Sequence, residues 1–194
     1  GERFVAVGDL FFHNNASSSD GINWTPFISN HNHWLNHVGY GGDYYILTGP
    51  AGQLFTSTNG INFTQRNTPD TDDLTDVSYD NGIYVIRKYH QVGKMIVSNN
   101  GINWTTRDTA SGGNPTKNNN NVSGGNGYFV FVVPDGVRVS QDGVNWSYHQ
   151  IAHPYSGSMP GVRFHKDAFY TIQTVAPDSN GMVQLKIGRS TNGS

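Results

Sequence analysis

The histidines at positions 31, 33 and 37 have the residue type and spacing that most directly suggest metal chemistry. His31 and His33 would share one side of an extended segment, where two imidazoles and an outside carboxylate could hold zinc. His37 instead occupies a slot that recurs along the chain, aligned with Asp76 and Asn121. We therefore predict no zinc site here.

Asp70, Asp72 and Asp73 offer the carboxylate oxygens that calcium prefers. Their segment lacks the glycine and the distal glutamate of an EF-hand, so no metal or other cofactor is predicted, although a weak oxygen-ligand site stays open. Catalysis is limited in a similar way, because the chain has no cysteine and its single glutamate is Glu2. Glycoside hydrolysis by two aspartates remains a catalytic alternative. We predict that the protein is not an enzyme.

Aromatic rings, imidazoles, amides and carboxylates concentrate in the segments between the repeats described below. This mixture suits sugar recognition, because rings stack on apolar sugar faces while polar groups bond the hydroxyls. The alternative, that they are solvated loops packing on a neighbouring subunit, stays open. The candidate ligand-binding residues are His31, His33, Trp34, Asp72, Asp73, Tyr89, His90, Arg107, His153 and Tyr155.

An internal repeat defines the elements that must position these residues. Its motif is Ser-x-Asp/Asn-Gly-x-Asn-Trp/Phe, and a fifth, shorter copy is Ser190-Thr191-Asn192-Gly193. The glycines at 21, 60, 101, 143 and 193 lie 39, 41, 42 and 50 residues apart, which is the spacing of propeller blades. The structural turn residues are Ser18, Asp20, Gly21, Trp24, Ser57, Asn59, Gly60, Phe63, Ser98, Asn100, Gly101, Trp104, Ser140, Asp142, Gly143 and Trp146.

A second pattern keeps the same phase, with a valine, an aromatic residue or glycine two positions later, and an aromatic residue seven positions later. It is found at Val38, Val77, Val122 and Val162. Together the patterns predict four antiparallel strands, a to d, which in the third repeat cover 74–79, 83–87, 94–98 and 102–107. The Asp/Asn-Gly pair is expected to form a type I′ turn between strands c and d. The following Trp or Phe is expected to be a wedge between neighbouring repeats.

The turn motif resembles the Asp-box of sialidase-type (BNR) repeat propellers, in the short variant of phage and bacterial surface proteins that lacks the residue between Asp and Gly. The strand Phe4-Val5-Ala6-Val7-Gly8 is similar to one that accompanies this variant. The resemblance spans the chain and implies a box that serves folding, on the face away from any site. Sialidase chemistry would also need an arginine trio and a Tyr–Glu pair, which Glu2 alone cannot supply. Arg66 and Arg107 occupy equivalent positions in successive repeats, so they are features of the repeat more than members of such a trio.

We therefore expect a single all-β domain over residues 1–194, a β-propeller of four-stranded antiparallel blades with five visible copies, either five-bladed or part of a larger ring. The repeats cover approximately 1–34, 35–73, 74–116, 117–158 and 159–194. The first copy begins at strand b and the fifth ends within its c–d turn. About 20–25 further residues from a longer parent chain, or another subunit, are expected to close a five-bladed ring.

Composition limits the partners. The net charge is −2 and there is no basic run or long apolar stretch, so neither nucleic-acid binding nor membrane insertion is expected. The Asn/Gly/Thr-rich, Lys-poor surface indicates an extracellular, cell-surface or virion location. We expect a binding propeller that recognises a cell-surface glycan or receptor, as a phage tail fibre, lectin or adhesin does. The alternative is a structural propeller that contacts other proteins or itself.

Overall fold

The computed structural model describes residues 3–8, 15–27, 34–69, 71–89, 93–109, 121–133, 136–151, 161–175 and 184–193. Every regular element in these ranges is a β-strand, and none of the described segments is a helix able to cross a membrane. The strands are β1 Phe4–Ala6, β2 Ala16–Ser18, β3 Thr25–Pro26, β4 His37–Gly41, β5 Tyr44–Thr48, β6 Leu54–Ser57, β7 Thr64–Gln65, β8 Leu74–Asp80, β9 Ile83–Lys88, β10 Lys94–Ser98, β11 Thr105–Asp108, β12 Val122–Gly125, β13 Tyr128–Val133, β14 Gly136–Ser140, β15 Ser147–Gln150, β16 Val162–His165, β17 Ala168–Val175 and β18 Gln184–Ser190.

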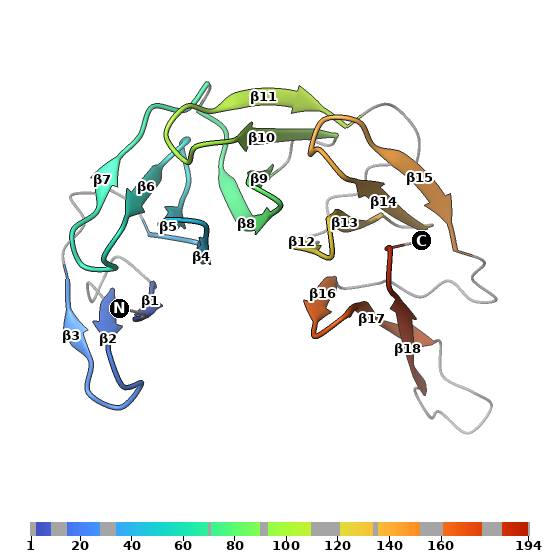
Figure 1. The fold of residues 1–194 in the computed structure, drawn as a ribbon, viewed down its shortest axis with the longest axis horizontal. Coiled ribbons are helices and arrows are strands. Elements are labelled where there is room, and N and C mark those ends of the chain that lie inside the picture. The colour runs from blue at the N-terminus through green and yellow to red at the C-terminus, as the bar shows by residue number, and fades with distance from the viewer. Residues whose placement is uncertain are drawn as a thin grey trace.

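These strands form five antiparallel sheets, which we number as blades 1 to 5. Blades 2, 3 and 4 have four strands each, and blades 1 and 5 have three, in the orders β1-β2-β3 and β16-β17-β18. Figure 1 shows the blades in an open arc, with β1, β4, β8, β12 and β16 along its inner wall and β3, β7, β11 and β15 on its outer rim. The predicted four-stranded antiparallel blade is confirmed.

The Ser-x-Asp/Asn-Gly turn is held together by its own side chains. In blade 1 the hydroxyl of Ser18 accepts hydrogen bonds from the backbone N–H groups of Asp20 (3.2 Å) and Gly21 (2.9 Å). Asp20 Oδ1 accepts those of Ile22 (2.9 Å) and Asn23 (2.8 Å). The turns that begin at Ser57, Ser98 and Ser140 repeat these bonds.

This geometry corrects the expected type I′ turn. Only the glycine of each pair has a positive φ, for example 68° at Gly143, whereas type I′ needs two such residues. The Asp or Asn oxygen bonds N–H groups two and three residues ahead, so the turn of blade 3 occupies 99–103 and strand d begins at Thr105. Paired positive φ values occur instead between strands a and b, at Asn81 (46°) and Gly82 (79°).

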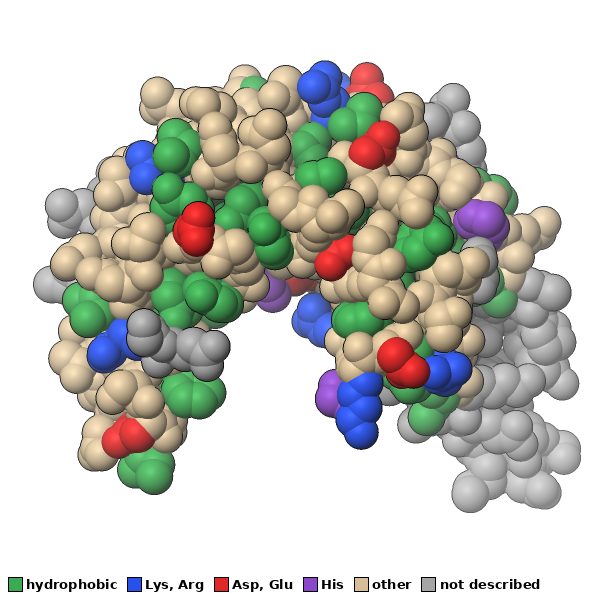
Figure 2. All heavy atoms as spheres, in the orientation of Figure 1, with side chains coloured by type: hydrophobic (Ala, Val, Ile, Leu, Met, Phe, Trp, Pro, Cys, Tyr) green, Lys and Arg blue, Asp and Glu red, His purple; other side chains and the backbone are tan. Residues whose placement is uncertain are grey.

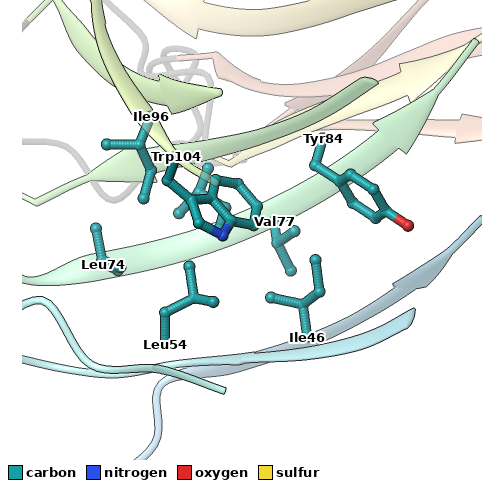
Figure 3. Close-up of a cluster of buried hydrophobic side chains, with 8 residues drawn as sticks. Ile46, Leu54, Leu74, Val77, Tyr84, Ile96 and Trp104 are labelled. Carbon is teal, nitrogen blue, oxygen red and sulfur yellow. The ribbon is translucent and has the colours of Figure 1, made fainter. Parts of the chain in front are cut away.

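The aromatic residue after each turn packs between blades where a preceding blade is present. Trp104 is 9 % exposed and lies among Ile46 and Leu54 of blade 2 and Leu74 and Ile96 of blade 3 (Figure 3). Trp146 belongs to the equivalent cluster between blades 3 and 4. The predicted wedge is thus confirmed at these two positions. It does not hold for Trp24, which lies at one end of the arc and is 43 % exposed.

The turn glycines lie against the preceding blade. A Cβ atom on Gly143 would lie 2.8 Å from the side chains of Val85 and Val97 in blade 3. One on Gly101 would lie 2.7 Å from the ring of Tyr44 in blade 2. Glycine is therefore required at these positions for two reasons: the positive φ, and the close approach of two blades.

Side-chain hydrogen bonds to backbone join neighbouring blades along the inner wall. The hydroxyl of Tyr84 donates to the carbonyl of Gly41 (2.7 Å). The Asn121 amide accepts the N–H of Val162 (2.9 Å) and donates to its carbonyl (2.5 Å). Because inner strands are sheet edges, such bonds satisfy backbone groups that strand pairing leaves free. The inner wall is thereby fixed in place.

Candidate functional site

The two ends of the blades differ in kind. We call the end with the repeat turns (18–23, 57–62, 98–103 and 140–145) the turn face, and the opposite end, where strand d leads to the next strand a and strand b to strand c, the loop face. A specific site is expected on the loop face, because its segments differ from blade to blade. The predicted ligand residues His31, His33, His90, His153 and Tyr155 lie outside the described residues.

Asp72 and Asp73, which we predicted to bind ligand, make contacts within the fold. Asp72 Oδ2 lies 2.6 Å from Nζ of Lys88, whose side chain is 2 % exposed. Asp73 Oδ1 accepts the N–H of Ala51 in blade 2 (2.9 Å), and its carbonyl accepts that of Tyr89 (2.7 Å). These contacts attach the segment before β8 to both blades. In the described part of the chain, no group of three or more His, Cys, Asp and Glu side chains could hold a metal ion.

The remaining predicted residues come from separate elements. Trp34 precedes β4 and is 49 % exposed. Tyr89 follows β9 and is half-buried, and Arg107 is exposed in β11 on the outer rim. Of these three, only Arg107 belongs to the cluster described below.

The sequence analysis did not predict a histidine–aspartate contact that lies on the inner wall. His37 Nδ1, at the start of β4, lies 2.9 Å from Asp76 Oδ1 in β8 and so joins blades 2 and 3. The pairing of β8 with β9 shifts register between Leu74 and Val77, where two residues of β8 face the single Arg87. Such bulges re-aim side chains. The alignment of His37 with Asp76 in successive repeats was the available signal, because equal slots meet on adjacent inner strands.

Arg87 lies opposite this bulge. Its guanidinium carbon is 5.8 Å from the ring centre of Phe131 in β13 of blade 4. Burial lowers the pKa of Arg87, and the nearby Asp76 carboxylate opposes that shift. Asp76 Oδ1 is paired with His37, and among the described residues none accepts a hydrogen bond from the Arg87 guanidinium. The Arg87 side chain is half-buried.

Two more arginines lie on the same interface between blades 3 and 4. Arg87 in β9 and Arg107 in β11 are both cross-strand partners of Met95 in β10. Met95 packs toward blade 4, and directly paired residues share a sheet face. Arg138 in β14 is the cross-strand partner of Phe131. We call Arg87, Arg107 and Arg138 the arginine cluster.

The members of the arginine cluster differ in exposure. Arg138 is buried and donates from Nη1 to the carbonyl of Thr109 (2.9 Å), whereas Arg107 is exposed. The space-filling view shows basic and histidine side chains along the inner wall, while much of the visible surface is neutral (Figure 2).

A surface hollow of about 410 Å³ lies elsewhere, between the end of β7 and the repeat turn of blade 3. It contains none of the predicted ligand residues. Its lining is mainly polar and comprises Gln65, Arg66, Asn67, Thr68, Pro69, Ile102, Asn103 and Trp104.

The sequence matches no protein-family model and no curated protein, but several solved β-propellers have a similar fold. A streptogramin B lyase superposes with a TM-score of 0.68 at 10 % identity over 93 % of this chain. YCF48 bound to a D1 peptide gives 0.65 at 16 % identity over 99 %, and an ancestral GH74 enzyme gives 0.64 at 17 % over 97 %. The chain spans 63 %, 75 % and 28 % of those proteins, respectively. At these identities the likeness concerns the fold alone, and it shows that this chain has the all-β propeller fold.

Proposed function

We propose that this protein is a non-catalytic binding propeller that recognises a cell-surface glycan through its loop face. The observation that carries the proposal is the difference between the two faces. On the turn face, the Ser and Asp or Asn oxygens bond the backbone of their own turn in the same way in blades 1 to 4. On the loop face, the segments that join one blade to the next differ in length and sequence. Such variation suits specific recognition, whereas the repeated turns serve the fold.

The non-catalytic part of the proposal rests on three acidic groups that the structure describes at the loop-face end of blade 3. Asp72 pairs with Lys88, Asp73 bonds Ala51 and Asp76 pairs with His37. A glycoside hydrolase needs two carboxyl groups that flank the scissile bond, and these three described carboxylates are engaged in contacts within the fold. The resemblance of the repeat turn to the short Asp-box of phage and bacterial surface proteins fits the same picture, with an extracellular or virion location.

The structural neighbours are compatible with this function without deciding it. YCF48 has been solved with a bound D1 peptide, so one propeller of this kind presents a ligand-binding surface. The streptogramin B lyase and the GH74 enzyme show that the same fold also hosts catalysis. Because a fold hosts unrelated functions, the proposal depends on the residues of the loop face.

A protein-binding, structural role is the second candidate, favoured by exposed apolar side chains in blade 1. Phe4, Ile22 and Trp24 are 57 %, 81 % and 43 % exposed. Large exposed apolar groups are typical of surfaces that contact other proteins. This candidate expects a stable oligomer or a captured protein partner, and light scattering with purified protein distinguishes it from a glycan-binding monomer.

A glycan array combined with whole-cell pull-down tests the first candidate. The protein should bind a restricted set of glycans, and Trp34→Ala on the loop face should weaken that binding. Ile22→Ala is the matched control, because Ile22 is 81 % exposed on the turn face. An array and a pull-down that both show no binding would contradict the proposal. So would equal losses for the two variants.

A further inference from the structure

The surface hollow between blades 2 and 3 has the size of a small-molecule site. Its volume is about 410 Å³, within the range of about 300–1,000 Å³ that such sites occupy. The end of β7 and the turn between β10 and β11 lie side by side at the outer rim (Figure 1) and form its two walls. Pro69 and Ile102, which is 39 % exposed, add apolar surface to the mainly polar lining.

The turn of blade 3 departs from the repeat at the wall of this hollow. In blades 1 and 4 the residue before the turn glycine is an aspartate, whose Oδ2 accepts a hydrogen bond from the side-chain amide of Asn23 (2.8 Å) or Asn145 (2.7 Å). Blade 3 has Asn100 in that position, and its Nδ2 is a donor that cannot accept this bond. The side-chain amide of Asn103, which lines the hollow, therefore has no partner among the described residues.

Trp104 shows a second difference between these turns. Nε1 of Trp24 and of Trp146 donates to the carbonyl of the glycine in its own turn, at 3.2 and 3.1 Å. Nε1 of Trp104 is buried and has no hydrogen-bond partner among the described residues, although buried donors are normally satisfied. The turn of blade 3 thus lacks two side-chain bonds that the turns of blades 1 and 4 have, and both residues concerned line the hollow.

The other polar groups of the lining belong to blade 2. Gln65 and Asn67 are exposed, and their side-chain amides have no partner within the described part of the chain. Arg66 is half-buried, and its Nε donates to the hydroxyl of Thr56 (2.8 Å), which orients the guanidinium. None of the described residues that line the hollow is acidic. The hollow therefore presents three primary amides and one anchored guanidinium.

We propose that this hollow binds a neutral sugar unit, with the side-chain amides of Gln65, Asn67 and Asn103 as its polar contacts. A primary amide both donates and accepts hydrogen bonds, as each sugar hydroxyl does, whereas an ionised carboxylate only accepts and would be opposed by the amide oxygens. Pro69 and Ile102 supply a surface for the apolar C–H face of the ring. The inference goes beyond the proposed function, because one wall of this site is a repeat turn and not the loop face.

Titration of the isotope-labelled protein with glucose, galactose, mannose and their disaccharides tests the proposal. At least one of these sugars should shift the side-chain NH₂ signals of Gln65, Asn67 and Asn103 in NMR spectra. Asn103→Ala should weaken that binding about threefold to tenfold, the usual contribution of a neutral hydrogen bond. Asn62→Ala is the matched control, because Asn62 has the same turn position in blade 2, is likewise exposed and does not line the hollow.

Asn100→Asp tests the same site without removing any residue of its lining. It introduces the aspartate of blades 1 and 4, which should hold the Asn103 amide within the turn and weaken sugar binding by a similar factor. Asn59→Asp adds the same charge to the turn of blade 2 and should leave binding unchanged. Equal losses for Asn100→Asp and Asn59→Asp would overturn the proposal, because charge alone would then explain them.

The remaining outcomes separate this site from the proposed function. Glycan binding that is lost in Trp34→Ala but unchanged in Asn103→Ala would overturn the hollow and retain the loop face. Binding that is weakened in Asn103→Ala but unchanged in Trp34→Ala would support the hollow and count against the loop face. Tighter binding of glucuronic acid than of glucose would overturn the neutral class of ligand. Amide signals that no neutral sugar shifts would overturn the site itself.

Discussion

His37 Nδ1 in blade 2 and Asp76 Oδ1 in blade 3 are 2.9 Å apart, with side chains that are 27 % and 14 % exposed. The pair links two inner strands at the loop face. It also engages the acidic group that acts on Arg87. Cohesion between the two blades and the electrostatic surroundings of Arg87 therefore depend on the same contact.

Replacing His37 should lower the stability of the fold. His37→Ala removes a hydrogen bond to a charged, partly exposed group, so we expect a loss of about 1 kcal/mol in the free energy of unfolding. Urea denaturation of the variant and the wild-type protein measures this loss. His165→Ala, at an exposed histidine of β16, is the control, and equal stability of the two variants would contradict the structural role of the pair.

Gly143→Ala should destabilise the fold by more than the backbone strain of an alanine at a φ of 68°. The new Cβ would lie 2.8 Å from Val85 and Val97, so blades 3 and 4 must separate slightly. We expect a loss of about 3 kcal/mol, the sum of backbone strain and overpacking. Gly82→Ala is the matched control, because Gly82 has a φ of 79° and no atom within 4 Å of the added Cβ. That variant should lose only about 1 kcal/mol, and similar losses at both sites would exclude the contact between blades as the cause.

The repeat tryptophans should differ in their contribution to stability. Trp104→Ala empties a buried position between blades 2 and 3 and should cost about 3–5 kcal/mol. Trp24→Ala changes a side chain that is 43 % exposed and should cost about 1 kcal/mol or less. Thermal and chemical denaturation of the two variants provide the comparison. A large loss at Trp24 would mean that the blade 1 face is covered in solution.

The Asp142 carboxylate should make the free energy of unfolding depend on pH in the acid range. Burial opposes ionisation of this carboxyl, but hydrogen bonds from the N–H groups of Asn145 and Val144 and from the side chains of Asn145 and Ser140 lower its pKa to about 2. The ordinary value is 3.8, so the ionised form stabilises the native state above that pH. This contribution is lost as the pH falls from about 4 to about 2.

Asp142→Asn, which copies the turns at Asn59 and Asn100, isolates that effect. The wild-type protein should be more stable than the variant at pH 7, and the difference should shrink below about pH 4. Urea denaturation at pH 7, 4 and 3 measures it. A difference that stays constant with pH would argue against the carboxylate as its source.

Several parts of the site could not be predicted from the sequence. Asp72 and Asp73 lie in an acidic loop segment that is typical of ligand sites, yet they contact Lys88 and Ala51. The local sequence does not indicate these partners. The prediction of a type I′ turn was wrong, because the Asp side-chain oxygen accepts hydrogen bonds from backbone N–H groups two and three residues ahead. The Asp-Gly dipeptide alone does not reveal these bonds. His37 was recognised as a repeat position, but its pairing with Asp76 depends on how neighbouring blades meet.

The sequence by itself determined the blade. Its repeat turn closes through hydrogen bonds between residues two and three positions apart, and the alternation of apolar residues sets each strand, so both are encoded locally. The tertiary structure decided which side chains meet across blades. Arg87 reaches Phe131, and Trp104 is buried while Trp24 is not, because these environments come from packing between whole sheets. Such contacts join residues one repeat apart, and a repeat presents the same local pattern whether or not a neighbouring blade covers it.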